Sequence, residues 1–379
     1  MTTLTKSPAG AANAVLGLSL AGLVLGLALV FIDLGSHGHA AFNTSSVGMM
    51  WGLPIVTYDY FVLTSTGLTM VACLSLAFGV REFDPIARRL LWLALASLAG
   101  GVVALMLELG HPLRSLVAIP FNFQTTSPLF WKVLFISAYA VLLLISLARG
   151  ASAAPSRALG LALFAAALGV TLIAGSVFGM MAMRPMWFGG EVPIFFLAEA
   201  VTGGLAFAIL GVYLAYGGQR GMPEGVRAVM TGSLPRLFAL MIAMTIGFVV
   251  MRTITGLWSN LDGLQVWDVI VASPLYHIHL WIGLVLPLAM MLLPGPRKDG
   301  TMQLLAALLV AAALFVGRYE FVVSGQMVPL FKGSWVPSLI DYTPSLTEWM
   351  LALASLSIAF FVYTAGNRVL DLESRSRAA

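Results

Sequence analysis

The residue types that could do chemistry are concentrated in one stretch, Glu108–Trp131, which reads ELGHPLRSLVAIPFNFQTTSPLFW. It contains a carboxylate (Glu108), an imidazole (His111) and a guanidinium (Arg114), and Lys132 follows directly. Only 9% of the chain is charged, so this crowding is unusual. Ionisable groups at membrane depth cost roughly 2.5–3.5 kcal/mol each on insertion scales, which makes them candidates for function. The alternative is ordinary loop residues beside a lysine whose amine reaches the interface.

Acid–base chemistry on a small apolar redox molecule fits these residue types. A quinone ring needs hydrogen-bond partners at its two carbonyls and a route for protons to water, in an otherwise apolar site. Glu108 and His111 are three residues apart and would share one helix face, with the glutamate as base and the histidine on a carbonyl. Tyr58 and Asp59, in the segment WGLPIVTYDY, are expected near the same membrane surface. Lys132 would lie about 6 Å below the start of its helix.

A second interpretation of Asp59 and Lys132 stays open. The two could form a buried ion pair that only fixes the packing of their helices. The helix that carries Lys132 is expected to begin at Ser127 and Pro128, an N-cap residue and a first-turn proline.

The histidines and the single cysteine argue against a metal or haem held by this chain. The five histidines do not form a three-ligand cluster, and His277 and His279 in YHIHLW point to different sides of one helix. Cys73 is the single cysteine and lies inside an apolar run. One cysteine cannot form an internal disulfide, and it cannot supply the ligands of an iron–sulfur cluster. We therefore expect no intrinsic haem or iron–sulfur cluster. The role of the YHIHLW stretch is not apparent from the sequence.

Composition places these residues in a polytopic helical membrane protein. The 379 residues are 60% hydrophobic, whereas soluble domains are about 45–50% apolar and about 25% charged. The basic excess therefore does not indicate nucleic acid. We predict an all-α integral membrane chain, one membrane domain over 1–379, with about ten spans near 13–33, 54–80, 88–108, 129–148, 159–182, 192–216, 234–257, 275–294, 301–323 and 346–364.

The basic residues predict the orientation of the chain. Cytoplasmic loops of membrane proteins carry an excess of Lys and Arg. One set of loops and termini carries fourteen: Lys6, Arg81, Arg88, Arg89, Arg149, Arg157, Arg220, Arg227, Arg236, Arg297, Lys298, Arg368, Arg375 and Arg377. The opposite loops carry four, Arg114, Arg184, Arg318 and Lys332. Both termini are therefore predicted to be cytoplasmic, in agreement with an even number of spans.

The translocated face collects the unusual residues and is expected to be a docking surface over a pocket. It receives the loops 34–53, 109–128, 183–191 and 258–274, and a long segment, 318–345, rich in aromatic residues and prolines. An iron–sulfur partner is expected to dock on 318–345.

Four segments, taken in order, resemble the NrfD/PsrC family of quinone-interacting membrane subunits: WGLPIVTYDYFVLTSTG, LELGHPLR, TSPLFWKVLFISAYAVLL and GQMVPLFKGSWVPSLIDYTPSLTEW. The resemblance runs from about residue 48 to 364. It implies two four-helix bundles plus flanking helices, no bound metal, and electron exchange between menaquinone or ubiquinone and an iron–sulfur (ferredoxin-like) subunit docked outside a bacterial cytoplasmic membrane. Cytochrome c or molybdopterin subunits are further partners in such complexes. Chain length and helix number resemble Dsr-type and alternative complex III subunits, by analogy only.

The resemblance also carries over site residues. The family's [DEH]-x-G-x-P turn falls on Glu108, Gly110 and Pro112, beside the quinone pocket. Its small-residue site in the second helix falls on Ser65–Gly67, where some complex III members have a histidine and this chain has Ser65. With Tyr58, Asp59, Arg114 and Lys132, Ser65 completes the expected quinone-binding set.

Two other functions stay open from the sequence. Glycine-interrupted helices with Glu199 and Arg252 inside the membrane are also typical of a secondary transporter or ion channel, although no internal repeat is clear. A purely structural membrane anchor for a redox partner would need no pocket. In the quinone interpretation, Glu199 next to Gly203 and Gly204 would relay protons from the pocket inward.

Overall fold

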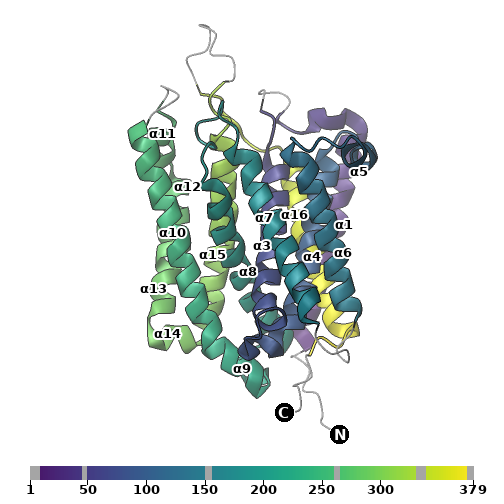
Figure 1. Ribbon diagram of the computed structural model, residues 1–379, viewed down its shortest axis with the longest axis vertical. Helices are drawn as coiled ribbons and strands as arrows, with labels where there is room; N and C mark the ends of the chain where they lie inside the picture. The colour runs from purple at the N-terminus through teal and green to yellow at the C-terminus, as the bar shows by residue number, and fades with distance from the viewer. Residues whose placement is uncertain (1–8, 45–48, 150–155, 260–264, 330–338, 374–379) are drawn as a thin grey trace.

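The computed structural model describes residues 9–44, 49–149, 156–259, 265–329 and 339–373, and it is all-helical (Figure 1). Helices account for 83% of the chain, and the described residues contain no strand. Ten helices in these ranges are long and apolar enough to cross a membrane. The predicted fold class and number of spans are therefore confirmed.

The spans begin and end close to the predicted limits. Eight are α1 (Ala9–His37), α3 (Leu53–Leu76), α4 (Asp84–Glu108), α6 (Pro128–Ala148), α7 (Arg157–Gly179), α8 (Val192–Tyr216), α15 (Gly300–Ser324) and α16 (Leu346–Val369). The seventh span joins α9 (Glu224–Thr231) to α10 (Ser233–Ser259). The eighth is built from α12 (Pro274–His277), the π-helix η4 (Ile278–Val285) and α13 (Leu286–Leu292). Short helices connect them: η1 (Gly38–Ala41), η2 (Arg81–Phe83), α5 (Pro112–Phe121), η3 (Gln219–Gly221), α11 (Val266–Ala272) and α14 (Pro294–Lys298).

We describe the inner spans as two groups of four with two flanking helices; α8 joins the two groups, because it packs against α3 and α7 as well as against α10 and α15. In the first bundle α3 packs against α4 and α7, and α7 packs against α6. In the second bundle α8 packs against α10 and α15, and α15 packs against η4 and α13. Helices α1 and α16 pack against each other, and α16 covers α4.

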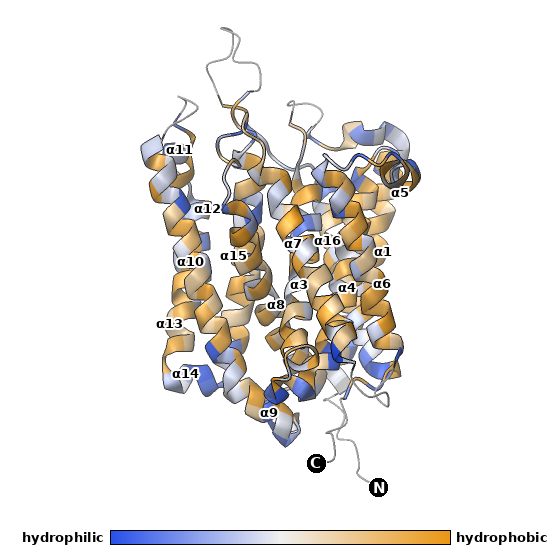
Figure 2. Ribbon diagram, in the orientation of Figure 1, coloured by the Kyte–Doolittle hydropathy of each residue, from blue (hydrophilic) through white to orange (hydrophobic). Residues whose placement is uncertain are grey.

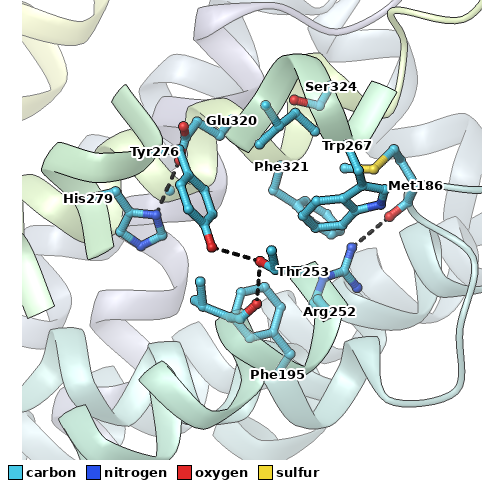
Figure 3. Close-up of a pocket in the computed structure, with 13 residues that line it drawn as sticks. Met186, Phe195, Arg252, Thr253, Trp267, Tyr276, His279, Glu320, Phe321 and Ser324 are labelled. Carbon is cyan, nitrogen blue, oxygen red and sulfur yellow. Dashed lines mark hydrogen bonds and ion pairs between the residues drawn. The ribbon is translucent and has the colours of Figure 1, made fainter. Parts of the chain in front are cut away.

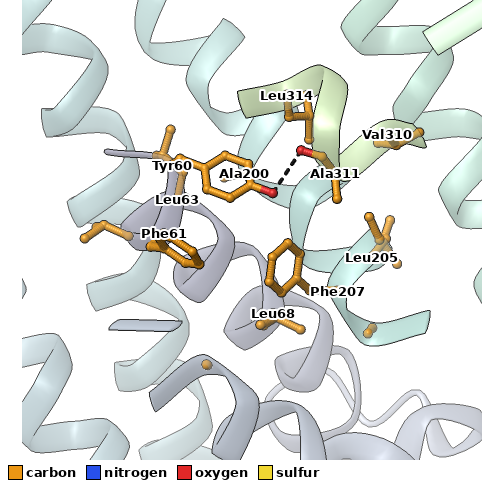
Figure 4. Packing of buried hydrophobic residues seen from close by; sticks show 14 of the residues in the cluster. Tyr60, Phe61, Leu63, Leu68, Ala200, Leu205, Phe207, Val310, Ala311 and Leu314 are labelled. Carbon is orange, nitrogen blue, oxygen red and sulfur yellow. Dashed lines mark hydrogen bonds between the residues drawn. The ribbon is translucent and has the colours of Figure 1, made fainter. Parts of the chain in front are cut away.

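The two bundles meet where α3 crosses α8 and α15. A Cβ on Gly67 would collide with the carbonyl of Ala200, and one on Gly204 would collide with the Gly67 backbone, so two glycines permit the backbones to touch. Beside this crossing, Tyr60 donates a hydrogen bond to the carbonyl of Ala311 (2.9 Å) and its ring meets Phe207 edge to face (Figure 4). The core of the molecule is therefore centred on α3, whose hydrophobic window is 89% buried.

Two predicted loops contain helices. The 109–128 segment forms α5, and the 258–274 segment forms α11; residues 260–264 lie outside the described part. Both lie at the end of the bundle that we call the α5 end, the upper end in Figure 1. Pro112 at the first position favours α5, because proline at a helix start loses no hydrogen bond.

The placement of Arg318 and Glu320 in a loop is wrong. Helix α15 continues unbroken from Gly300 to Ser324 and carries both side chains inside the span. Each has a buried partner on another helix: Arg318 pairs with Glu199, and Glu320 with His279. Pairing lets the helix keep these residues at membrane depth, so no loop is required.

The described ends of the chain lie together. Arg368, near the end of α16, donates a hydrogen bond to the Asn13 side chain near the start of α1. Both ends are therefore on the side of the bundle opposite α5, as an even number of spans requires. The cytoplasmic assignment of that side stays a prediction from the basic residues.

Candidate functional site

Three residues of the expected site come together between α3 and α6. The Lys132 ammonium lies 3.3 Å from the Asp59 carboxylate and 4.6 Å from the centre of the Tyr58 ring. Asp59 and Tyr58 are each 1% exposed. The second oxygen of Asp59 has no hydrogen-bond partner among the described residues. A buried carboxylate oxygen without a donor is costly, so this atom is available to a hydroxyl of a bound molecule.

Glu108, the last residue of α4, lies nearer the membrane surface. Gly101 of α4 is level with Tyr58, so Glu108 is seven residues, or about 10 Å, further toward the α5 end. One of its carboxylate oxygens is buried and lacks a partner in the described part of the chain. The ring of His39 reaches the backbone carbonyl of Glu108 at 2.8 Å. Glu108 thus stands between the buried Asp59–Lys132 pair and the water at the α5 end.

The structure does not bring His111 and Arg114 to this pair. Both side chains are exposed, His111 just before α5 and Arg114 in its first turn. Helix α5 also exposes apolar residues four apart, Leu113, Val117 and Phe121. An apolar stripe on an exposed helix is typical of a helix that lies in the membrane interface.

Ser65 lies deeper, in a hydrogen-bond network that is closed by the protein itself. Its hydroxyl donates to the carbonyl of Ala94 (2.7 Å) and meets the Tyr139 hydroxyl at 2.8 Å. Thr69 meets the same tyrosine at 2.7 Å. Tyr139 follows Lys132 by two helical turns on α6, so this network lies about 10 Å further from the α5 end than the lysine. The structure therefore does not join Ser65 to Asp59.

Glu199 sits at the junction of the two bundles. Its carboxylate is paired with Arg318, and the guanidinium stacks on Phe196 with 3.7 Å to the ring centre. A cavity of about 220 Å³ beside the pair is lined by Tyr60, Thr64 and other residues of α3 and α15. The Glu199 carboxylate interacts electrostatically with Asp59 in the first bundle and with His279 in the second. It therefore links the charged residues of the two bundles.

Sequence reasoning missed a second cluster, in the second bundle. A pocket of about 430 Å³ lies between α8, α10, α11, η4 and α15 (Figure 3). His279 contacts Glu320 there at 3.2 Å, and Arg252 donates to the carbonyl of Met186 at 2.6 Å. The signal was in the sequence, since the YHIHLW stretch supplies Tyr276 and His279, but only the fold shows that they face Glu320 and Arg252.

The buried ionisable residues share one depth. We call Asp59, Lys132, Glu199, Arg252, His279, Arg318 and Glu320 the ionic layer. Each lies four to seven residues inside the α5 end of its helix, roughly 6–10 Å at 1.5 Å per residue. In the hydropathy view, hydrophilic positions interrupt the apolar spans toward this end (Figure 2). The layer runs sideways through both bundles.

The described part of the segment after α15 folds back onto the protein. The Tyr342 hydroxyl donates to Glu348 (2.6 Å) and accepts from the backbone of Leu53 (2.9 Å). Burial and the neighbouring Glu348 raise the pKa of the Tyr342 hydroxyl above its usual range. Phe321 and Tyr342 are buried. Of the other predicted docking residues, Lys332, Trp335 and Pro337 lie outside the described part of the chain.

Within the described residues, no group of three or more His, Cys, Asp or Glu side chains could hold a metal ion.

Comparison with known proteins identifies the family. The model of "Polysulphide reductase, NrfD" matches residues 41–330. The chain is 24% identical over 364 residues to a selenate reductase subunit of Mesobacillus selenatarsenatis, covering 83% of this chain and 84% of that protein. It is 22% identical over 358 residues to the Hdr-like menaquinol oxidoreductase integral membrane subunit of Archaeoglobus fulgidus, covering 87% of each. This multi-pass integral membrane protein therefore belongs to the NrfD family.

Proposed function

We propose that this chain is the quinone-exchanging membrane subunit of a multi-subunit oxidoreductase. The observation that carries the proposal is the buried Lys132–Asp59 pair with Tyr58, below a Glu108 oxygen that has no partner in the described residues. Both relatives are named as subunits of redox complexes, and one of them as a menaquinol oxidoreductase subunit. We infer the same substrate class here, menaquinone or ubiquinone, exchanged with the membrane pool.

Lys132 and Asp59 can form hydrogen bonds with the oxidised and the reduced form of the substrate, respectively. Lys132 can donate a hydrogen bond to a quinone carbonyl, since an ammonium has three donors and Asp59 uses one. The free oxygen of Asp59 can accept from a quinol hydroxyl. Oxidation of a quinol releases two electrons and two protons. Asp59 and Glu108 would hold the protons in turn, and Glu108 is the one placed toward water.

The electrons require a partner. The single cysteine, Cys73, is buried and lies within α3, so this chain offers no cysteine-ligated cluster. We propose an iron–sulfur subunit docked at the α5 end, on the part of the predicted segment 318–345 that follows α15, with the ring site roughly 10 Å below it by helix rise. Cytochrome c or molybdopterin subunits would lie beyond that subunit. The complex would sit in a bacterial cytoplasmic membrane, with the α5 end in the periplasm.

The test is turnover of quinol or quinone by the purified native complex carrying Lys132→Gln or Glu108→Gln. Glu108→Gln keeps the shape but removes the base, which typically costs about 10²–10⁴ in rate. Lys132→Gln should raise KM and lower kcat, because it removes a donor and leaves Asp59 unpaired. Lys298→Gln, the same change on the exposed short helix α14 at the opposite end, is the control and should have no effect.

His111 is tested separately, because its side chain is exposed and apart from the pair. If it closes over the ring and bonds a carbonyl, His111→Ala should raise KM more than it changes kcat. The amount of bound iron–sulfur partner is measured on every preparation. Normal turnover in both Glu108→Gln and Lys132→Gln would rule out this site, and loss of the partner instead of turnover would show that the region holds the complex together.

A further inference from the structure

We propose that the pocket between α8, α10, α11, η4 and α15 is a second ring-binding site, in the second bundle, for a neutral quinone or quinol. It rests on the proposed function only for the identity of the ligand. The pocket itself is a separate feature, with different residues on different helices from the Asp59–Lys132 pair.

The walls of the pocket suit a flat, apolar ring. Phe195, Phe321 and Trp267 line it together with Met186 and Ile270. Most of the residues that line it are aromatic or aliphatic, as is usual for sites that bind small organic ligands. Aromatic rings prefer offset or edge-to-face contact with other rings, which these walls can provide.

Polar groups stand at two opposite ends of these walls. Figure 3 shows His279 and Glu320 on one side and Arg252 on the other, with Phe321 between them and the Trp267 ring on the side of Arg252. The Nε2 atom of His279 and one oxygen of Glu320 have no hydrogen-bond partner among the described residues. His279 is only 4% exposed and lines the pocket, so a molecule in the pocket can reach this nitrogen. A ring with oxygen atoms at opposite edges matches this arrangement.

The backbone is adapted to hold these side chains. The π-helix η4 contains His279, and single π-helical turns inside longer helices are frequent at functional sites. Gly317 makes room for the imidazole, because a Cβ there would lie 2.5 Å from Cε1 of His279. Gly256 in the same way makes room for the Trp267 indole. Gly317 on α15 thus leaves space for His279, and Gly256 on α10 leaves space for the ring of Trp267.

The charge of the pocket and its depth in the bundle restrict the chemical class of the ligand further. The fixed charges that line the pocket are one arginine, Arg252, and one carboxylate, Glu320, so they balance and offer no net attraction to an ionic ligand. Arg252, His279 and Glu320 belong to the ionic layer, roughly 6–10 Å inside the helix ends, a depth that favours an apolar ligand over a polar one. A neutral ring with a membrane-soluble tail fulfils all these conditions.

The experiment is photolabelling of the native complex with a short-tailed azido-naphthoquinone, followed by mapping of the labelled peptides. Two sites of label are expected, one on peptides with Tyr58 or Lys132 and one on peptides with Trp267, Tyr276 or Phe321. An excess of the unreactive naphthoquinone should displace both. Label in the second bundle that excess quinone does not displace would be unspecific and would overturn the proposal.

Variants assign the second label. His279→Phe keeps a ring but removes the polar end, and should lower label in the second bundle by about tenfold, the effect of one lost hydrogen bond of ordinary strength. Gly317→Ala pushes the imidazole from its place and should act likewise, whereas Gly247→Ala on α10, which has open space beside it, should not. Label at Tyr58 or Lys132 should be unchanged in all three.

The outcomes separate this proposal from the proposed function. Label at the first site alone, with normal turnover, would overturn the second site and leave the function intact. Label in the second bundle alone, lost in His279→Phe, would support the second site and move the function away from Lys132. Absence of displaceable label from both bundles would overturn both.

Discussion

At the residue scale, the most consequential contact is the ion pair between Glu199 and Arg318. Arg318 is 2% exposed and Glu199 5% exposed, and the pair links α8 to α15 beside the junction of the bundles. A buried charge that loses its partner is strongly destabilising, whereas an apolar replacement of the whole pair is often tolerated. The pair can therefore be structural, functional or both, and substitution in two steps distinguishes these roles.

We predict that Glu199→Gln destabilises the protein by about 3–5 kcal/mol, because Arg318 is left buried without a counter-charge. The measurement is unfolding of the purified protein in detergent. The double variant Glu199→Gln/Arg318→Met should recover most of the loss. If Glu199 relays protons, as its position between Asp59 and His279 suggests, turnover and linked proton movement stay low in the double variant.

Recovery of both stability and turnover in that double variant would make Glu199 a packing residue. If the single variant Glu199→Gln were as stable as the wild type, Glu199 and Arg318 would not form a buried ion pair.

At the element scale, the crossing of α3 and α8 holds the two bundles together. Gly67 and Gly204 bring the two backbones into contact. Close approach of this kind lets van der Waals packing drive association of helices in a membrane, where no hydrophobic force acts between them. The crossing joins α3, which carries Asp59, to α8, which contributes Phe195 to the pocket of the second bundle.

We predict that Gly67→Ala lowers the yield of folded protein and destabilises it by at least the roughly 1–3 kcal/mol typical of overpacking, since the new methyl group meets the Ala200 backbone. Gly17→Ala on α1, where nothing lies within 4 Å, is the matched control. Size-exclusion profile and thermal unfolding are the measurements. Equal behaviour of the two variants would show that the bundles do not meet as described.

At the scale of the whole molecule, the ionic layer places the buried ionisable residues of both bundles at one level. Both bundles contribute to it, and it lies toward one end of the spans. In the function we propose, such a layer would let protons pass sideways between the bundles without crossing the membrane. The side of the membrane toward which the layer lies would then decide where protons are released, so topology is the property to measure first.

We predict that a reporter fused after Ala379 is cytoplasmic and that one inserted near Ser334 is external. The expectation rests on fourteen basic residues against four in the loops and termini. A cytosol-active and a periplasm-active reporter are compared at both positions. The reverse pattern would move the α5 end, with Glu108 and the proposed docking segment, to the cytoplasmic side.

The sequence by itself determined the class, the number of spans and the family of this protein. Long apolar runs can only cross a membrane as helices, because each backbone group must be satisfied within its own segment. The pairing of Asp59 with Lys132 could also be predicted from the sequence, because each is one of few charged residues and lies a few residues inside the end of a helix. Ser127 and Pro128 marked the start of α6 correctly.

The tertiary structure alone decided which charges meet. Partners such as Glu199 and Arg318, or His279 and Glu320, are 119 and 41 residues apart, and no local pattern links them. The apolar periodicity of a span predicts its length but not which neighbour its charged residue faces. Helix α5 was missed although Pro112 marks its start, and the unbroken α15 was missed because it depends on charges being neutralised by partners on other helices.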